Sequence, residues 1–197
     1  MRPVRVAITG AIGSGKTAAL RYFGRCGAAV MSCDEAVRSE LAANRVLRAR
    51  LRRAFGDGIF AGGRLCRRRL ARLVFADRRK VAALNRLVHP YVKRRVRAFF
   101  RKNRSRRVAA VEVPLLFETD FHRLFDVTIG VAIGVRRQRQ RLGRSGRGRE
   151  GIRRMRWQLS EREKLARCDF IIDNRGTRAA THQQIKKLME DEQWLKK

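Results

Sequence analysis

The stretch from Gly10 to Thr17, GAIGSGKT, restricts what this chain can fold into more than any other part of the sequence. It matches the pattern G-x-x-x-x-G-K-[ST], follows the short apolar run Val4–Ile8 and opens a stretch with an apolar helical face, Thr17–Cys26. The glycines let successive N–H groups curl around phosphate oxygens, and the helix that follows points the positive end of its dipole at the same anion. The sequence therefore predicts a loop that binds a nucleoside triphosphate, built from Gly13, Ser14, Gly15, Lys16, Thr17 and Ala18.

Two side chains of this loop have separate expected roles. Lys16 supplies a positive charge to the β- and γ-phosphates, and the Thr17 hydroxyl is the expected ligand of Mg²⁺. The motif does not choose among GTPases, ATPase motors and small-molecule kinases. No N-K-x-D motif for reading guanine is present, and no apolar strand ends in an acidic pair, which leaves a small kinase as the favoured class.

Short apolar runs elsewhere predict the rest of a parallel sheet. They are Ala28–Met31, Val108–Val113, Val127–Ile133 and Phe170–Ile172. From Asp34 to about Lys102 the pattern is helical, and Pro90 is expected to kink or restart the last of these helices. We therefore expect a single α/β domain over residues 1–197, with a core of 1–33 and 105–197. A helical acceptor-binding insertion is expected at 34–104, and an arginine-rich lid at about 136–158.

The composition is strongly basic, with 49 Lys and Arg against 17 Asp and Glu and a formal net charge of +32. Such a charge attracts polyanions, although the arginines are spread along the chain and are not interleaved with aromatic residues as a base-stacking surface requires. Non-specific polyanion binding and a plain compositional bias toward arginine both explain the charge. Specific nucleic-acid binding is not expected.

A membrane span, disulfides and a cysteine-based zinc site have little support in the sequence. No apolar run approaches the roughly 18 to 20 residues that span a bilayer, and the N-terminal stretch lacks the layout of a signal peptide. The four cysteines form no C-x-x-C pair. We expect a cytoplasmic protein with reduced thiols.

A carboxylate near the γ-phosphate and a group of arginines around it are what a small kinase needs. Asp34 lies just beyond the second predicted strand, at the sheet edge where open α/β folds bind ligands, and it could equally cap the helix that follows. The arginines between Arg136 and Arg156 fit the second need, and they also fit a solvated helix face.

Six segments in order resemble the motifs of the dephospho-CoA kinase family. They are ITGAIGSGKT, VMSCDEAVR, LCRRRLARLVFAD, LNRLVHP, VEVPLLFE and RMRWQLSEREKLARCDFIIDNRG, and the resemblance covers about residues 4 to 190. It implies an enzyme that uses ATP and Mg²⁺ to phosphorylate the ribose 3′-hydroxyl of dephospho-CoA, the last step of coenzyme A biosynthesis.

The resemblance also implies roles for single residues. Asp34 matches the general base. Arg67, His89, Pro114, Leu115 and Leu116 match positions that face the acceptor. Arg141 and Arg154 match the lid region, and Asn174 and Gly176 match a late loop on the adenine side of ATP. From the residues alone, His89 could instead pack between helices, and Asn174 could be a turn residue at a strand end.

The chain departs from the family pattern at several positions. Ser32 stands where the first aspartate of a D-x-D pair is usual, Cys66 where an aspartate is common, and Glu112 where an aspartate precedes VPLL. Ala18 replaces a hydroxyl residue. Lys16, Thr17 and Asp34 are retained. The alternatives are another small nucleotide kinase, or a basic nucleic-acid-binding protein with a vestigial kinase site.

Overall fold

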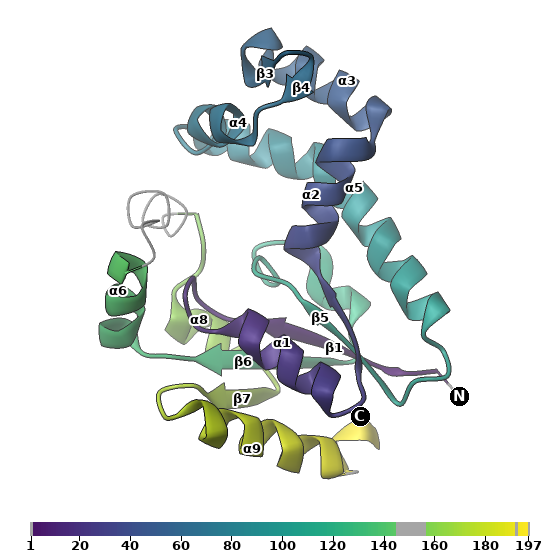
Figure 1. The fold of residues 1–197 in the computed structure, drawn as a ribbon, viewed down its shortest axis with the longest axis vertical. Helices are drawn as coiled ribbons and strands as arrows, with labels where there is room; N and C mark the ends of the chain where they lie inside the picture. The colour runs from purple at the N-terminus through teal and green to yellow at the C-terminus, as the bar shows by residue number, and fades with distance from the viewer. Residues whose placement is uncertain (1, 145–156, 192, 197) are drawn as a thin grey trace. The chain divides into compact units, whose positions relative to one another are not determined.

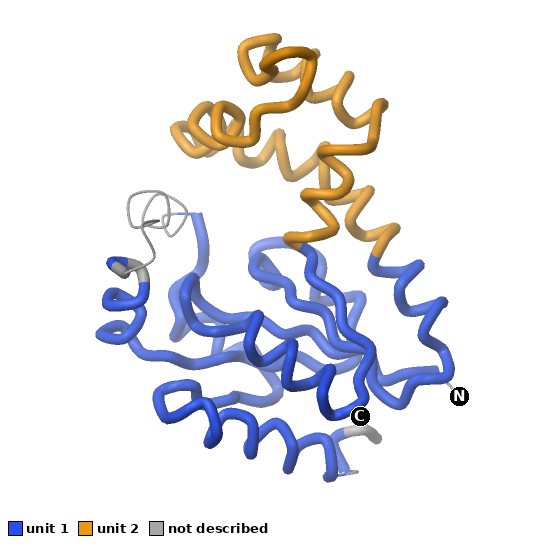
Figure 2. The backbone as a smooth tube through the Cα atoms, in the orientation of Figure 1, with its two compact units in different colours: residues 1–33, 96–197 blue, residues 34–95 orange. Residues whose placement is uncertain are grey.

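The computed structural model describes residues 2–144, 157–191 and 193–196. The chain divides into two compact units (Figure 2): Met1–Cys33 together with Val96–Lys197, and Asp34–Arg95. The first unit contains the Gly10–Thr17 motif, and the second contains most of the helical stretch.

The first unit is built on a parallel sheet, as the apolar runs predict. Its strands are β1 (Val4–Thr9), β2 (Ala29–Ser32), β5 (Val108–Glu112), β6 (Val127–Ala132) and β7 (Phe170–Asp173). They lie in the order β2-β5-β1-β6-β7, and all four neighbouring pairs are parallel. The predicted α/β fold class is confirmed.

Burial explains why these strands were visible in the sequence. All five residues of β5 are buried, so the strand reads as VAAVE without alternation, as expected for a parallel strand covered on both faces. The helices α1 (Lys16–Arg25) and α9 (Arg178–Glu190) contact each other beside the sheet (Figure 1). Phe23 of α1 and Ile185 of α9 are fully buried in the core cluster that includes the strands.

The first unit also contains α6 (Val135–Arg144) and α8 (Glu161–Leu165), and α8 contacts β6. Helix α8 begins with a capping box in which Ser160 and Glu163 each accept a hydrogen bond from the other's backbone N–H. Two short 3₁₀ helices, η2 (Asp120–Leu124) and η3 (Gln193–Lys196), complete the described part of the unit. Residues 145–156 of the predicted lid, with Arg154, lie outside the described residues.

The second unit is mainly helical. Its elements are α2 (Cys33–Ala43), α3 (Arg45–Phe55), η1 (Asp57–Ile59), β3 (Phe60–Ala61), β4 (Arg64–Leu65), α4 (Arg67–Val74) and most of α5 (Arg78–Lys102). Strands β3 and β4 form an antiparallel hairpin inside the stretch for which the sequence predicts helices. Its two-residue loop, Gly62-Gly63, has φ values of 55° and 71°, which suit a hairpin turn of the mirror-image type.

Helix α5 continues through Pro90. It runs from Arg78 to Lys102 as one element with Pro90 inside it, so the helix does not restart at this residue, and the alternative of a kink stays a prediction. A proline removes one hydrogen bond from the helix ladder, while burial of a whole face opposes a break. Val88, Val92 and Val96 form that face, and each is at most 5% exposed.

In the described part of the chain, no helix combines the length and the apolar character needed to cross a membrane.

Candidate functional site

The loop between β1 and α1 adopts a backbone that requires glycine at its key positions. Gly13 and Gly15 have φ values of 80° and 97°. Gly10 has the close approach: a Cβ there would lie 2.7 Å from the carbonyl oxygen of Val131 and 2.8 Å from Ser14 Oγ. The glycine spacing of the motif therefore follows from the shape of the loop and from its contact with β6.

Lys16 lies at the start of α1 with its ammonium group turned into the loop. Its Nζ donates hydrogen bonds to the carbonyl oxygens of Gly10, at 3.1 Å, and Ala11, at 2.8 Å. The residue is only 7% exposed. A buried cation held at the mouth of a glycine loop and beside a helix N-terminus is a ready partner for phosphate oxygens.

Thr17, the next residue, contacts an acid at the end of a neighbouring strand. Its Oγ1 donates to Glu112, with 3.1 Å to each carboxylate oxygen. Glu112 is the last residue of β5 and is 5% exposed. It is paired in register with Ser32 at the end of β2, and Asp34 follows two residues later in the chain.

The Thr17–Glu112 pair fits a magnesium ion. Mg²⁺ in nucleotide sites usually takes one or two protein oxygens and completes its shell with water and substrate phosphates. Among the described residues no group of three or more His, Cys, Asp or Glu is placed to hold a metal ion, so a dedicated all-protein cage is absent from that part of the chain. A hydroxyl and one carboxylate suffice when ATP supplies the other ligands.

Two side chains of helix α6 donate hydrogen bonds to the loop of residues 10–17, which is called the phosphate loop below. Gln138 is 5% exposed and donates from Nε2 to the Ile12 carbonyl oxygen at 2.9 Å. Arg141, one turn further on, is exposed and donates from Nη1 to the Gly13 carbonyl oxygen at 3.2 Å. The guanidinium group predicted for the phosphate side thus lies at the loop.

Asn174 follows β7, and its side chain amide is hydrogen-bonded to the phosphate loop. Its Nδ2 donates to the Ser14 carbonyl oxygen at 2.6 Å, and its Oδ1 accepts from the Thr181 hydroxyl of α9 at 2.9 Å. A Cβ at Gly15 would collide with this amide. Gly176, two residues further on, accepts a hydrogen bond at its carbonyl oxygen from Arg137 Nη1 at 3.2 Å.

Pro114, Leu115 and Leu116 follow β5 after the single residue Val113. The Pro114 carbonyl oxygen accepts a hydrogen bond of 2.6 Å from Lys164 Nζ, and the same ammonium group lies 2.9 Å from Glu118 Oε1. Leu116 is fully buried, and Leu115 is half-buried.

The remaining predicted residues lie in the second unit. Asp34 is exposed in the first turn of α2, where its backbone carbonyl accepts a hydrogen bond from Arg38 Nε. Arg67 is the first residue of α4 and lines a pocket of about 510 Å³ together with Arg38, Arg48, Arg64, Leu41, Ala42 and Leu65. This pocket combines several guanidinium groups with an apolar lining.

His89 of α5 is half-buried, and its environment disfavours the imidazolium form. Burial, with the nearby charge of Lys93 as a second cause, lowers the pKa of His89 to about 4. The imidazole is therefore neutral near pH 7, and it can donate one hydrogen bond and accept one.

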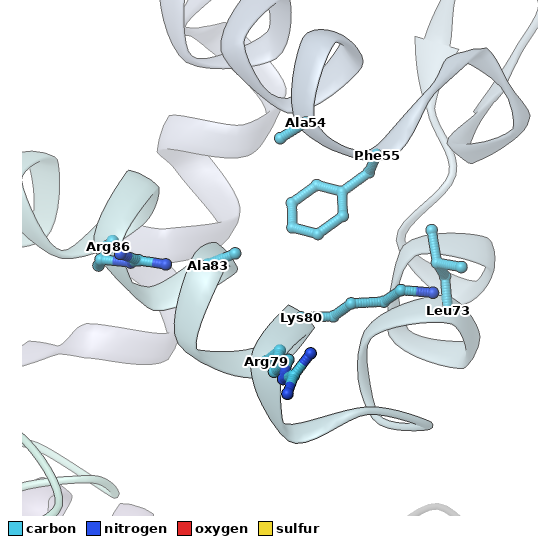
Figure 3. A pocket seen from close by; sticks show the side chains of 7 residues that line it. All are labelled: Ala54, Phe55, Leu73, Arg79, Lys80, Ala83 and Arg86. Carbon is cyan, nitrogen blue, oxygen red and sulfur yellow. The ribbon is translucent and has the colours of Figure 1, made fainter.

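A second pocket in this unit, of about 500 Å³, contains none of the predicted site residues. It is lined by Ala54, Phe55, Leu73, Arg79, Lys80, Ala83 and Arg86 (Figure 3). The Phe55 ring projects into the space between the helices, with the Lys80 side chain extended nearby.

Comparison with known proteins identifies the group to which the chain belongs. A family model described as dephospho-CoA kinase matches residues 4–180. The chain belongs to the dephospho-CoA kinase family. A dephospho-CoA kinase from Thermobifida fusca is 34% identical over 191 residues, which cover 95% of this chain and 96% of that protein. One from Thermus thermophilus is 36% identical over 180 residues, covering 89% of this chain and 85% of the relative.

Two solved structures share the fold of this chain. The crystal structure of TT1252 from Thermus thermophilus has a TM-score of 0.81 and 31% identity, covering 96% of this chain and 98% of the other. A dephospho-CoA kinase from Campylobacter jejuni has a TM-score of 0.56 at 19% identity, covering 94% and 95% of the two chains, and supports the dephospho-CoA kinase fold.

Three residues of the site were not assigned roles from the sequence. Glu112 was noted only as a variation in a motif, although a single acid at the end of a buried strand is a usable signal. Lys164 lay inside a quoted motif without a role. Gln138 is one polar residue in an arginine-rich helix, and nothing in the sequence distinguishes it.

Proposed function

We propose that this member of the dephospho-CoA kinase family transfers the γ-phosphoryl group of ATP to the ribose 3′-hydroxyl of dephospho-CoA. The products are coenzyme A and ADP. The observation that carries the proposal is the placement of Lys16 and the Thr17–Glu112 pair around one glycine loop. A cytoplasmic site of action is part of this proposal.

The donor side of the reaction is assigned to the first unit. The backbone N–H groups of Gly13, Gly15, Lys16 and Thr17 would hold the phosphates. Those of Ser14 and Ala18 donate to the carbonyl oxygens of Ala11, at 3.1 Å, and Gly15, at 2.9 Å, and would have to exchange these partners for phosphate oxygens. Thr17 and Glu112 would hold Mg²⁺, which when bound neutralises charge on the β- and γ-phosphates. Arg141 and the late loop at Asn174 and Gly176 complete the ATP side.

The acceptor side is assigned to residues 34–104 and to the segment after β5. Arg67 would attract the pyrophosphate of dephospho-CoA, and neutral His89 would hydrogen-bond without adding charge. Pro114 and Leu115 would present an apolar edge to the acceptor, and the fully buried Leu116 would anchor this segment in the core. The cationic lining of the pocket at Arg67 supports a polyanionic substrate.

In the reaction the 3′-hydroxyl oxygen forms a bond to the γ-phosphorus as the bond from that phosphorus to the β,γ-bridging oxygen breaks. Asp34 accepts the hydroxyl proton late in this process, because the alcohol is a weak acid until its oxygen is bonded to phosphorus. General-base help of this kind is worth about 10² to 10⁴ in rate. Residues 136–158 are proposed as the lid that excludes water and so prevents hydrolysis of ATP.

The test is ADP release from Mg-ATP with and without dephospho-CoA, for the wild type and for Asp34→Asn. We expect strong stimulation by dephospho-CoA and its loss in the variant. Stimulation that survives the substitution would remove Asp34 from its role as base. No stimulation would contradict the acceptor, and a panel of nucleoside monophosphates would then test for another small kinase.

A binding measurement addresses the nucleic-acid alternative. Affinity for a random-sequence duplex DNA is measured at several salt concentrations. Non-specific binding gives a steep fall in log K with log salt, and this binding is compatible with the kinase reaction. A vestigial kinase would bind DNA and show no acceptor-dependent release of ADP.

A further inference from the structure

Lys164 is a fully buried lysine in the short helix α8, and its ammonium group has three oxygen partners. Nζ lies 2.6 Å from the Pro114 carbonyl oxygen, 2.9 Å from Glu118 Oε1 and 3.4 Å from Gln158 Oε1. An ammonium group has three N–H donors, so these contacts can use all of them. Glu118 Oε1 also accepts a hydrogen bond of 2.9 Å from the backbone N–H of Leu159.

The segment that Lys164 contacts has little backbone support of its own. The hydrogen-bond ladder of the sheet ends where Val113 N donates to the Ile8 carbonyl oxygen at 2.9 Å. Beyond it, Thr119 Oγ1 donates to the Leu115 carbonyl oxygen and Lys164 to that of Pro114. Side chains hold this turn in place because no strand pairing reaches it.

We propose that Lys164 is a positioning residue for the acceptor. Through the Pro114 carbonyl oxygen it fixes the turn that carries Leu115 and Leu116, and through Glu118 it ties this turn to residues 157–159 at the end of the predicted lid. The inference rests on the proposed function, which assigns Pro114, Leu115 and Leu116 to the acceptor side.

The pairing is poorly suited to stability alone. Glu118 is 12% exposed at its side chain, and its Oε2 has no hydrogen-bond partner among the described residues. A buried ion pair repays the loss of hydration only when its remaining oxygens and protons are satisfied. An apolar pair would fill this space without an unpaired carboxylate oxygen, so the charges are better explained by the geometry that they impose on the Pro114 carbonyl.

The experiment compares three variants with the wild type. Lys164→Met leaves the Glu118 charge buried and is expected to lower the Tm. Lys164→Met with Glu118→Gln removes both charges and keeps an acceptor for Leu159 N–H, so its Tm should return most of the way to the wild-type value. Glu118→Gln alone retains the bond from Lys164 to Pro114. The matched control, Lys186→Met with Glu190→Gln, makes the same changes in an exposed pair of α9.

Steady-state kinetics separate positioning from a structural role. In the double variant of Lys164 and Glu118 we expect the KM for dephospho-CoA to rise about tenfold or more, as for a small misplacement of a substrate contact. The KM for ATP should stay within about twofold of the wild type, and Glu118→Gln should keep a near-normal acceptor KM. An unchanged acceptor KM in the double variant, or an equal rise in both KM values, would overturn the proposal.

The variant Leu115→Ala distinguishes a failure of the Lys164 proposal from a failure of the acceptor assignment on which that proposal rests. This variant removes a half-buried acceptor-side residue without touching Lys164. If Leu115→Ala raises the acceptor KM and the double variant does not, Lys164 is not a positioning residue and the acceptor assignment stands. If neither variant raises it, the assignment of Pro114, Leu115 and Leu116 to the acceptor fails and the inference fails with it.

Discussion

The Thr17 hydroxyl donates to Glu112, and its oxygen is 3.1 Å from both oxygens of that carboxylate. The two residues are far apart in sequence and meet because α1 starts from the end of β1 while Glu112 ends the adjacent β5. One side of the phosphate loop therefore carries a negative charge, and Lys16 carries the positive one. This is the polarity that a complex of ATP with a divalent cation needs.

Replacing the Glu112 carboxylate should weaken the binding of the divalent cation. For Glu112→Gln we expect the Mg²⁺ concentration that gives half-maximal activity to rise about 10- to 100-fold, as for loss of a partner to a metal ligand. Activity titrations with Mg²⁺ at saturating ATP measure this. Glu112→Asp keeps the charge and is the control, with a much smaller rise. Equal effects of both substitutions would show that the carboxylate charge is not the property used.

Asn174 should matter for the shape of the phosphate loop. Asn174→Ala leaves the Ser14 carbonyl oxygen without this donor, while the Thr181 hydroxyl keeps the Thr177 carbonyl oxygen at 3.2 Å as its acceptor. A buried group left unpaired costs about 1–3 kcal/mol, so we expect a lower free energy of unfolding together with a raised KM for ATP. Denaturant unfolding and steady-state kinetics measure the two effects. Asn103→Ala, which removes one local bond to the Phe99 carbonyl oxygen, should leave the KM for ATP unchanged.

Arg141 should act on catalysis with little effect on stability, because its side chain is exposed and its hydrogen bond to Gly13 is a surface contact. For Arg141→Ala we expect kcat to fall about 10²-fold, the usual loss for one preorganised donor at a phosphoryl group, and the Tm to stay near the wild-type value. Arg139→Ala removes the same charge from an exposed position of the same helix and should change kcat little. Similar falls in kcat in both variants would show that the net charge of the helix, and not the position of Arg141, is the property used.

The neutral imidazole of His89 should make stability depend on pH. Its pKa of about 4 in the folded protein lies below the ordinary value of 6.5, because burial and Lys93 disfavour the charged form. As the pH falls from 7 toward 5, the unfolded chain binds a proton at this residue that the folded chain does not bind, so the free energy of unfolding decreases. The decrease from this residue ends near pH 4. Calorimetric Tm values at pH 7 and pH 5 should therefore differ less in His89→Gln than in the wild type, and an equal difference would contradict the assignment.

The parts of the fold that could be predicted are those in which a single segment has a hydrophobic pattern that identifies its secondary structure. The inner strand β5 is buried on both faces and therefore reads as an uninterrupted run, while the edge strands β2 and β7 are apolar although Val30 and Ile171 are exposed. The helix α5 continues through Pro90 without a restart because the buried valines on the same helix face outweigh the one hydrogen bond that proline removes. The Gly62-Gly63 hairpin was missed because each of its strands is only two residues long.

The residues of the candidate site also divide into those that a contiguous motif predicts and those that depend on distant segments. The glycine loop with Lys16 and Thr17 could be predicted because the motif is contiguous. The partners of these residues could not, because they depend on pairings between distant segments: Glu112 reaches Thr17 over 95 residues, and Pro114 reaches Lys164 over 50. Asp34, Arg67 and His89 were assigned through family motifs, and their roles toward the acceptor remain predictions.

The bond between Asn174 and Ser14 has a consequence for how the protein is made. The two residues are 160 positions apart, so the ribosome completes the phosphate loop long before it synthesises the amide that supports it. Strand β1 likewise has no partner strand until its two neighbours, β5 and β6, have been synthesised. A nascent chain that stops before β7 would contain the entire nucleotide-binding motif without the Asn174 amide that donates to it. Competence to hold ATP should therefore arise only after β7 and Asn174 have been synthesised.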